Sequence, residues 1–303
     1  MNHPADSRSV LAVLTLIAAS ACFLPAAEEA PFPTRIASPA WLHGNLGEPN
    51  LAVLDVRHDV KHYWQEHIPG AIFLAPDALT LTDHGVPAKL MPPDILARIL
   101  GRLGITESTT VVVYSATADS LSPYLTWALD YVGHEHHALL EGGLDRWKVE
   151  SLPLSQGFPK TSPVEYRLRA EMNESVLASL EDVRAARAKE DVILLDTRSP
   201  KAFAGEKGHW ERNGHIPGAV NRPWKKDLRD DYTWRSAEEL APEYQALGVN
   251  RDKPVILSCG QGLRATHTYV TLKYILGYPD VKVYDGSFSE WTNATGTEVE
   301  TGP

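Results

Sequence analysis

A cysteine within a glycine-rich stretch is the residue of this sequence best suited to covalent chemistry. Cys259 opens the run Cys-Gly-Gln-Gly-Leu-Arg, which ends at Arg264 and follows the apolar stretch 255–257. Glycines let a loop curl so that successive backbone N–H groups point inward, and the start of a following helix adds positive charge. Such a loop stabilises a thiolate, the nucleophilic form of cysteine. We therefore expect Cys259 to be a catalytic nucleophile, because a small core residue, the alternative, would leave the glycines and the arginine without a use.

The residues that follow the cysteine are expected to bind the substrate. Their backbone amides would surround the reacting sulfur, and Arg264 would add a permanent positive charge at the rim. An anionic substrate needs such charge, so Lys201 and Arg212 are further candidates to supply it. The candidate substrate-binding residues are Gly260, Gln261, Gly262, Leu263, Arg264 and Lys201.

Two charged residues could support the site. Asp196 and Arg198 follow another apolar stretch, where they would either hydrogen bond near the loop and add positive field, or form an internal ion pair. The pattern recurs at Asp55 and Arg57, which favours the ion pair.

Three tryptophans could line a cleft, but burial is the more common role of this residue. They are Trp64, Trp210 and Trp224.

An internal repeat covers most of the chain. Four motifs occur twice in the same order, at offsets of about 141 to 148 positions, which indicates duplication. Because His215 recurs as His67, we expect it to be a turn residue and not an acid or base. The motif pairs are 54–57 with 195–198, 67–71 with 215–219, 111–114 with 255–258, and 142–147 with 286–291.

Each copy has the pattern of an α/β unit. Short runs of Val, Ile and Leu at 192–195 and 255–257 predict buried parallel strands. Apolar spacing over 265–276, followed by Gly277, predicts a helix whose counterpart is 122–132. The alternation predicts two domains, each a mainly parallel sheet flanked by helices.

Length and charge restrict the function. The 303 residues, with 43% apolar side chains and a net charge of −10, suit two folded domains and exclude disorder as the main state. The negative charge and the lack of a Lys/Arg-rich run exclude a nucleic-acid binder. Only two cysteines are present, so there is no disulfide framework.

The N-terminal residues predict export. An apolar run over 10–24 follows Arg8 and leads into the small residues 19–21, which a signal peptidase reads. The run is too short to span a bilayer comfortably, and a buried N-terminal helix is the alternative. Cys22 follows the small residues in a sequence that resembles a bacterial lipobox, so a lipid anchor at Cys22 is a second expectation. We expect the protein in the bacterial periplasm, with contact to the membrane only through this anchor.

The repeated motifs resemble the rhodanese family of sulfurtransferases over essentially everything after residue 40. The string Tyr-Asp-Gly-Ser-Phe-Ser-Glu-Trp at 284–291 carries the resemblance most specifically. The resemblance implies two rhodanese-like domains, with one active cysteine in the second. It further implies a ping-pong reaction in which a cysteine persulfide passes sulfane sulfur to cyanide or a thiol. No metal and no organic cofactor are implied.

The first copy lacks the features that the chemistry needs. Ser115 stands where Cys259 stands in the second copy, and 116–119 contain no glycine and no arginine. A serine without a general base is a poor nucleophile, so we expect this copy to be non-catalytic and to form one wall of the cleft, with a serine hydrolase as the weaker alternative.

Four residues separate Cys259 from Arg264, one fewer than in the dual-specificity phosphatases that share this fold. The shorter loop favours sulfur transfer over phosphoryl transfer.

The sequence leaves two candidates for the sulfur donor. Family members that use thiosulfate or mercaptopyruvate often carry an arginine where Ala202 stands, and Gln261 and Arg264 depart from the mercaptopyruvate type of loop. We expect thiosulfate first and 3-mercaptopyruvate second. The rival function is a low-turnover persulfide carrier or sensor that delivers sulfur to a partner. The expected partners are thus a small anionic donor and a thiophilic acceptor.

Proline-rich segments divide the chain. The expected order is a signal peptide at 1–21, a tether at 22–39, a non-catalytic domain at 40–154, a linker at 155–178 and a catalytic domain at 179–303.

Overall fold

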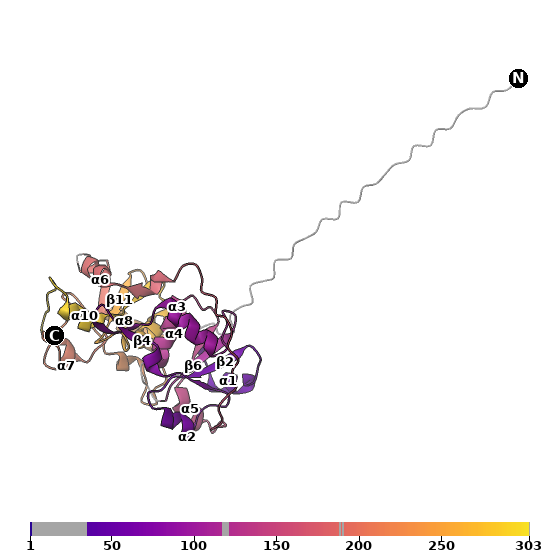
Figure 1. Cartoon of the computed structure of the whole chain (residues 1–303). Helices are drawn as coiled ribbons and strands as arrows, with labels where there is room; N and C mark the ends of the chain where they lie inside the picture. The colour runs from indigo at the N-terminus through magenta and orange to yellow at the C-terminus, as the bar shows by residue number, and fades with distance from the viewer. Residues whose placement is uncertain (2–34, 117–120, 188, 190, 303) are drawn as a thin grey trace. The chain divides into compact units, whose positions relative to one another are not determined.

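The computed structural model describes Met1 and residues 35–116, 121–187, 189 and 191–302 (Figure 1). The expected signal peptide, the possible anchor at Cys22 and most of the expected tether lie outside the described residues. Within the described part, no helix is both long enough and apolar enough to cross a membrane.

Two five-stranded parallel sheets with the same strand order form the framework, which confirms the predicted α/β fold. The first sheet has the order β1 (Ile36–Ala37), β7 (His137–Leu140), β6 (Thr110–Tyr114), β2 (Leu51–Asp55) and β3 (Ile72–Phe73). The second has the corresponding order β8 (Leu177–Ala178), β12 (Val281–Tyr284), β11 (Val255–Ser258), β9 (Ile193–Asp196) and β10 (Val220–Asn221).

Helices accompany both sheets, as the right-handed connections between parallel strands require. In the first half they are α1 (Pro39–Asn45), α2 (Val60–Gln65), α3 (Pro93–Arg102), α4 (Leu121–Tyr131), α5 (Gly143–Val149) and the short 3₁₀ turn η1 (Pro76–Ala78). In the second half they are η2 (Glu174–Val176), α6 (Leu180–Ala186), α7 (Pro200–Phe203), η3 (Trp224–Asp227), α8 (Ala237–Ala246), α9 (Ala265–Val270), the π-helical η4 (Thr271–Ile275) and α10 (Ser287–Asn293).

The central strand of the second sheet places the cysteine. β11 lies between β9 and β12, and all four of its residues are buried, as expected for a strand covered on both faces. Cys259 follows at its carboxyl edge, where open parallel sheets place their ligands. The helix predicted over 265–276 is present as α9 continued by η4, and the chain turns at Gly277 with a φ of +65°.

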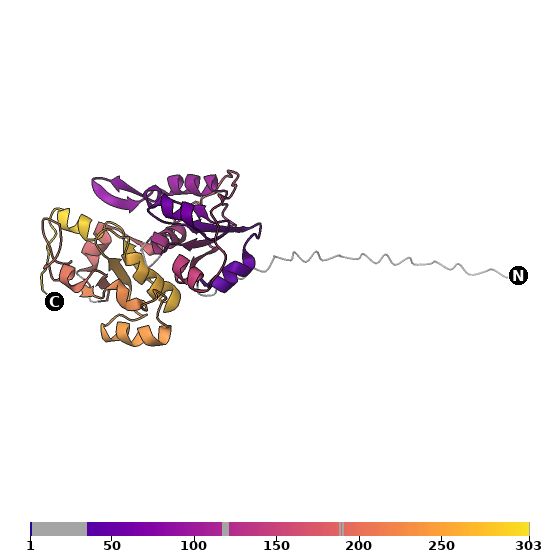
Figure 2. The same ribbon diagram turned by 90° about the horizontal axis from the view of Figure 1, so that it is seen from below.

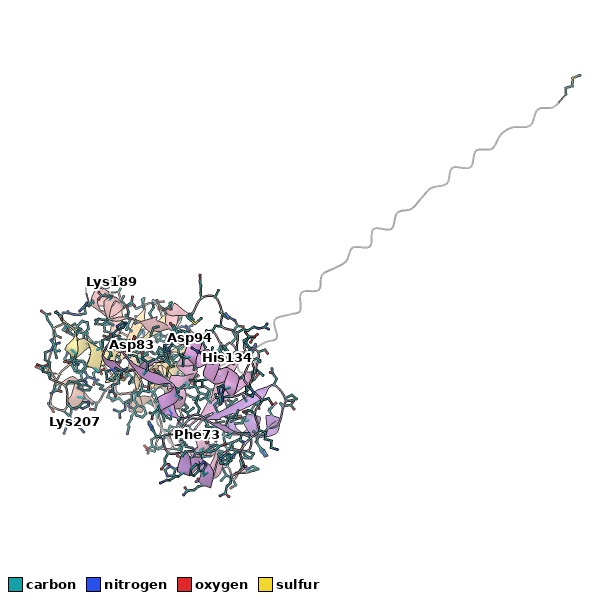
Figure 3. The ribbon with its side chains drawn as sticks, in the orientation of Figure 1. Phe73, Asp83, Asp94, His134, Lys189 and Lys207 are labelled. Carbon is teal, nitrogen blue, oxygen red and sulfur yellow. The ribbon has the colours of Figure 1, made fainter. Side chains whose placement is uncertain are left out.

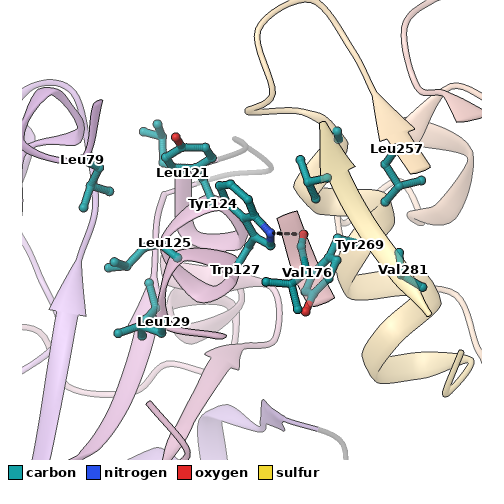
Figure 4. Close-up of a cluster of buried hydrophobic side chains, with 14 of the residues drawn as sticks. Leu79, Leu121, Tyr124, Leu125, Trp127, Leu129, Val176, Leu257, Tyr269 and Val281 are labelled. Carbon is teal, nitrogen blue, oxygen red and sulfur yellow. Dashed lines mark hydrogen bonds between the residues drawn. The ribbon is translucent and has the colours of Figure 1, made fainter. Parts of the chain in front are cut away.

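The two halves share one apolar core, in which α4 packs against α9. The indole N–H of Trp127 donates to the Val176 carbonyl over 2.9 Å, as Figure 4 shows beside Tyr269. Asp130 accepts hydrogen bonds from the hydroxyls of Tyr269, at 2.7 Å, and Tyr274, at 2.5 Å. Residues of both halves are therefore buried against one another in a single core.

Short strands lie inside the two segments that are expected to be a tether and a linker. β1, within the expected tether, pairs with β7, and β8, within the expected linker, pairs with β12. A strand of two residues is too short to show an alternating pattern. Each sheet thus begins earlier in the chain than the prolines indicate.

The first half also carries an antiparallel hairpin, formed by β4 (Thr80–Asp83) and β5 (Val86–Leu90). Figure 2 shows the hairpin beside the C-terminal helix α10, and β5 contacts that helix. In the second copy the equivalent place, after η3, has only an antiparallel bridge between Leu228 and Trp234, so the repeat gives little sign of a two-stranded hairpin.

Candidate active site

Cys259 lies on the wall of a cleft with a volume of ≈ 880 Å³. Its side chain is buried, with a residue exposure of 2%, and packs partly against the apolar core. The loop after it, Gly260, Gln261, Leu263 and Arg264, lines the same cleft, and His58 and Leu121 from the first half complete the wall. The sulfur is therefore at the bottom of a shared cavity.

The backbone amides of the cysteine loop fall into two sets. Those of Cys259 and Gly262 donate to the hydroxyl of Ser287, over 3.1 and 3.0 Å, and Ser287 in turn donates to the Tyr284 carbonyl over 2.7 Å. The amides of Gly260, Gln261, Leu263 and Arg264 have no acceptor in the described part of the chain. One set holds the shape of the loop, and the other is available to a negative charge.

Neighbouring atoms lie close to the two glycines of the cysteine loop. Gly262 has a φ of +82°, and a Cβ there would lie 2.5 Å from the Asp285 carbonyl oxygen. At Gly260, a Cβ would lie 3.3 Å from the indole ring of Trp210. Gly262 therefore needs a residue without a side chain, whereas a side chain at Gly260 would require the Trp210 ring to move by a few tenths of an ångström.

The cleft concentrates positive charge in an otherwise acidic protein. Among the described residues that line it, none is an aspartate or glutamate, although the chain has a net charge of −10. The exposed guanidinium of Arg264 has no carboxylate within 4.0 Å among the described residues. A cavity lined by one sign of charge concentrates ligands of the opposite sign. The cationic lining residues are Arg198, Lys207, Lys225 and Arg264.

Lys201 and Arg212, predicted to supply charge here, lie elsewhere. Lys201 is exposed on α7 and lines a separate cavity of ≈ 750 Å³ with His215. Its neighbour Ala202 lines the cysteine cleft instead, and Pro200 lines both cavities, because successive residues of a helix face different directions. The guanidinium of Arg212 donates to the carbonyls of Thr292 and Thr297 and holds the C-terminal segment.

Asp196 and Arg198 form a buried ion pair, with a closest N–O distance of 2.5 Å. Arg198 also donates to the Gly214 carbonyl over 2.7 Å and lies 4.1 Å above the ring of Phe288. The equivalent residues Asp55 and Arg57 form the same pair at 2.6 Å in the first half. His215 hydrogen bonds the Phe203 carbonyl through Nδ1 over 2.9 Å, away from the cysteine.

Several lining residues come from a segment that is longer in the second copy. Seventeen positions separate Arg198 from His215, against ten between Arg57 and His67. The longer segment brings Lys207, His209 and Trp210 into the cleft, and Figure 3 shows Lys207 near α7. The unequal offsets of the two motifs are the sequence signal that could have found these residues.

The three tryptophans differ in burial: Trp224 is buried, Trp210 is half-buried and Trp64 is exposed. Trp210 and Trp224 line the cleft, whereas Trp64 is 51% exposed. The Lys225 ammonium lies 5.5 Å from the centroid of the Trp224 ring, and the imidazole of His267 stacks on the same ring. Aromatic faces with cations beside them can hold a flat or anionic group.

Ser115 occupies the position in the first half that Cys259 has in the second. It follows β6 and is buried, and its hydroxyl lies 2.9 Å from the hydroxyl of Ser122. Residues 117–119 of the compared loop lie outside the described residues. Cys259 is the free cysteine of the described part.

A duplicated α/β fold with a thiol loop at a sheet edge defines the class to which this chain belongs. The family model of the rhodanese-like domain matches residues 38–150 and 179–294, so the chain is a member of the rhodanese family of sulfurtransferases, with the domain present twice.

Similar proteins carry sulfur-related names. The sulfur carrier protein TtuD of Thermus thermophilus is 36% identical over 281 residues, which cover 89% of this chain and 98% of TtuD. A thiosulfate sulfurtransferase of Corynebacterium glutamicum is 32% identical over 287 residues, covering 92% and 94% of the two chains. The crystal structure of YnjE superposes with a TM-score of 0.81 at 24% identity, covering 91% of this chain and 70% of that one, and shows the fold alone.

Proposed function

We propose that the protein is a thiosulfate sulfurtransferase that carries sulfur as a persulfide of Cys259. In the first step, the thiolate attacks the outer sulfur of thiosulfate, the S–S bond of the donor breaks, and sulfite leaves with the bonding electron pair. In the second step, cyanide or a thiolate attacks the terminal sulfur of the persulfide and restores the Cys259 thiolate. Covalent catalysis of this kind divides one transfer into two easier steps.

The observation that carries the proposal is the combination of free loop amides and cations around one thiol. Within the described part of the chain, four loop amides have no acceptor and the Arg264 guanidinium has no carboxylate partner, and their residues line the cleft beside Cys259. Both the donor and the persulfide are anions. Fixed dipoles and charges aimed at a developing anion stabilise it without reorganisation.

A sulfur carrier is the second candidate, and two observations favour it. The relative from Thermus thermophilus has that name, at 36% identity. The cleft, with a volume of ≈ 880 Å³, is also far larger than thiosulfate and is of the size that accommodates an organic ligand. In this version the same persulfide forms, but the acceptor is a group on a partner protein.

A turnover assay separates the two functions. Purified protein is incubated with thiosulfate and cyanide, and thiocyanate is measured over time. Many turnovers per protein support the enzyme, whereas one equivalent of sulfur without turnover supports the carrier. Replacing thiosulfate by 3-mercaptopyruvate tests the second donor, and an aryl phosphate tests phosphatase activity.

The matched variants are Cys259→Ser and Ser115→Ala. We expect Cys259→Ser to lower sulfur transfer by at least about a thousandfold, the scale seen when a covalent nucleophile is removed. Ser115→Ala, at the equivalent position of the other half, is expected to keep the wild-type rate. Full activity of Cys259→Ser would contradict the proposal.

We also propose that residues 1–21 direct export to the periplasm and that Cys22 is a candidate for lipid attachment. The support is the sequence alone: the apolar run 10–24 and the small residues before Cys22. The intact mass of the protein isolated from membranes and from periplasm tests both parts. A mass that includes residues 1–21 would contradict them.

A further inference from the structure

We propose that the non-catalytic half positions the catalytic loop through the β4–β5 hairpin, with Asp285 as the positioning residue that connects the two. The inference goes beyond the proposed function, because it concerns the shape of the Cys259 loop and holds for any reaction of that thiol.

On one side, Asp285 is in direct contact with the loop. Its carbonyl oxygen is the atom that a Cβ at Gly262 would meet at 2.5 Å, and its Oδ1 would be 3.0 Å from the same point. Two residues later, Ser287 accepts hydrogen bonds from the amides of Cys259 and Gly262. A displacement of Asp285 would therefore move both the floor of the loop and its hydroxyl anchor.

On the other side, both carboxylate oxygens of Asp285 are held by the first half. The backbone N–H of Leu90, on β5, donates to Oδ2 over 2.7 Å, and the ammonium of the neighbouring Lys89 lies 3.7 Å from the same oxygen. The hydroxyl of Tyr124, on α4, donates to Oδ1 over 3.4 Å. Asp285 itself is 3% exposed, so these contacts replace water around the charge.

Charged and titratable groups face Asp285 from each of these elements. Lys89 lies on β5, Tyr124 and the more distant Tyr131 on α4, and Glu290 on α10, 3.9 Å from the Lys89 ammonium. Burial raises the pKa of Asp285 to about 6, while Lys89 opposes the increase and Glu290 adds to it. Below that pH the carboxyl group is protonated, and its ion pair with Lys89 is lost. The hold of the hairpin on the loop is thus expected to weaken in mild acid.

The test uses the full chain with Lys89→Met, which leaves Asp285 and the loop residues chemically unchanged. We expect kcat to fall on the order of tenfold with little change in KM, less than the roughly hundredfold that a misplaced reacting group can cost. The acid limb of the kcat profile should move to higher pH, because Lys89 no longer favours the carboxylate. Amide hydrogen exchange should increase in the peptide that contains 260–264.

Two further variants make the result specific. Lys61→Met, an equivalent change at an exposed lysine of α2, should match wild type in all three measurements. Lys89→Arg retains the charge and should restore the pH profile even if Lys89→Met is less stable. If Lys89→Met has the same profile, kcat and exchange as Lys61→Met, the proposal is wrong.

The exchange measurement separates this proposal from the function. If thiosulfate supports no turnover in wild type but the loop exchange still increases in Lys89→Met, the donor assignment fails and the positioning role stands. If turnover is normal and the loop exchange and pH profile do not respond, the positioning role fails alone.

Discussion

At the scale of single residues, the hydroxyl of Ser287 organises the site without touching the cysteine sulfur. Its backbone has a φ of +48°, an uncommon conformation for a residue with a side chain, and its hydroxyl bonds two loop amides and one carbonyl. A strained residue of this kind persists where its surroundings determine its conformation. The two amides that it uses are thereby withdrawn from a ligand, and the four that remain are the anion-binding set that we propose.

Gly262→Ala is expected to destabilise the protein and to lower activity. The substitution combines a φ of +82° with a 2.5 Å approach to the Asp285 carbonyl, and we expect it to lower the free energy of unfolding by about 3 kcal/mol or more. Gly248→Ala is the control, since its φ of +76° is similar but nothing lies within 4 Å of its Cβ position. We expect that variant to lose about 1 kcal/mol. Equal losses in urea denaturation would show that the contact with Asp285 has no effect.

Arg264→Met is expected to weaken donor binding more than it slows the chemistry. The guanidinium lines the cleft and has no carboxylate partner among the described residues, so its charge is available to an anion. We expect KM for thiosulfate to rise about three- to tenfold, a modest effect because the side chain is exposed to solvent. Arg167→Met, at an arginine that does not line the cleft and whose side chain is 74% exposed, is the control. An unchanged KM in Arg264→Met would remove Arg264 from the donor site.

At the scale of elements, the sequence predicts the long features of each sheet better than its edges. Buried runs such as β9 and β11, and the helix after the cysteine, follow from hydrophobic pattern and from the glycine that ends the helix. The strands β1 and β8 are too short to have a pattern. The β4–β5 hairpin has only an antiparallel bridge, between Leu228 and Trp234, as its counterpart in the second half, so the duplication gives little sign of two paired strands.

The candidate site likewise has one part that the sequence predicts and another part that it does not. The cysteine loop is contiguous in sequence, and its position after a buried strand locates it at the sheet edge. Lys207 and Lys225 enter the cleft from separate segments through tertiary packing, which local patterns do not encode. The position of Lys201 in the sequence predicts a role at the site, but in the structure its residue on α7 lines another cavity.

Asp285, where β12, α10 and the hairpin meet, is expected to make stability depend on pH. Burial raises its pKa to about 6 from the model-compound value of 3.8, so the folded state retains a proton that the unfolded state has released between these values. The contribution of this group to stability is fully present below pH ~4 and is lost as the pH rises through ~6. Asp285→Asn has no such titration. Relative to wild type, it should gain about 1–3 kcal/mol between pH 4.5 and 7.5 in urea denaturation.

Parallel stability profiles for the two proteins would contradict this expectation. If Asp285→Asn gains stability and loses turnover together, the buried carboxylate is retained for its role at the loop, in spite of its cost to folding.

At the scale of the whole molecule, the shared core predicts that the catalytic half does not fold alone. Residues of both halves form one apolar cluster, and the hydroxyls of Tyr269 and Tyr274 bond Asp130 of the other half. A fragment of residues 171–303 would expose this surface and leave both hydroxyls without their partner. We expect the fragment to bind a hydrophobic dye and to lack a cooperative thermal transition. A sharp transition near that of the full chain would show that the halves are independent.

The central claim is that Cys259 holds a second sulfur atom, and the mass of the peptide that contains Cys259 tests it most directly. The protein is incubated with thiosulfate, digested without reductant and measured beside an untreated sample. We predict a gain equal to the mass of one sulfur atom on this peptide, removed by cyanide with release of thiocyanate. A Cys259 peptide that keeps its original mass while the protein still transfers sulfur would contradict the account.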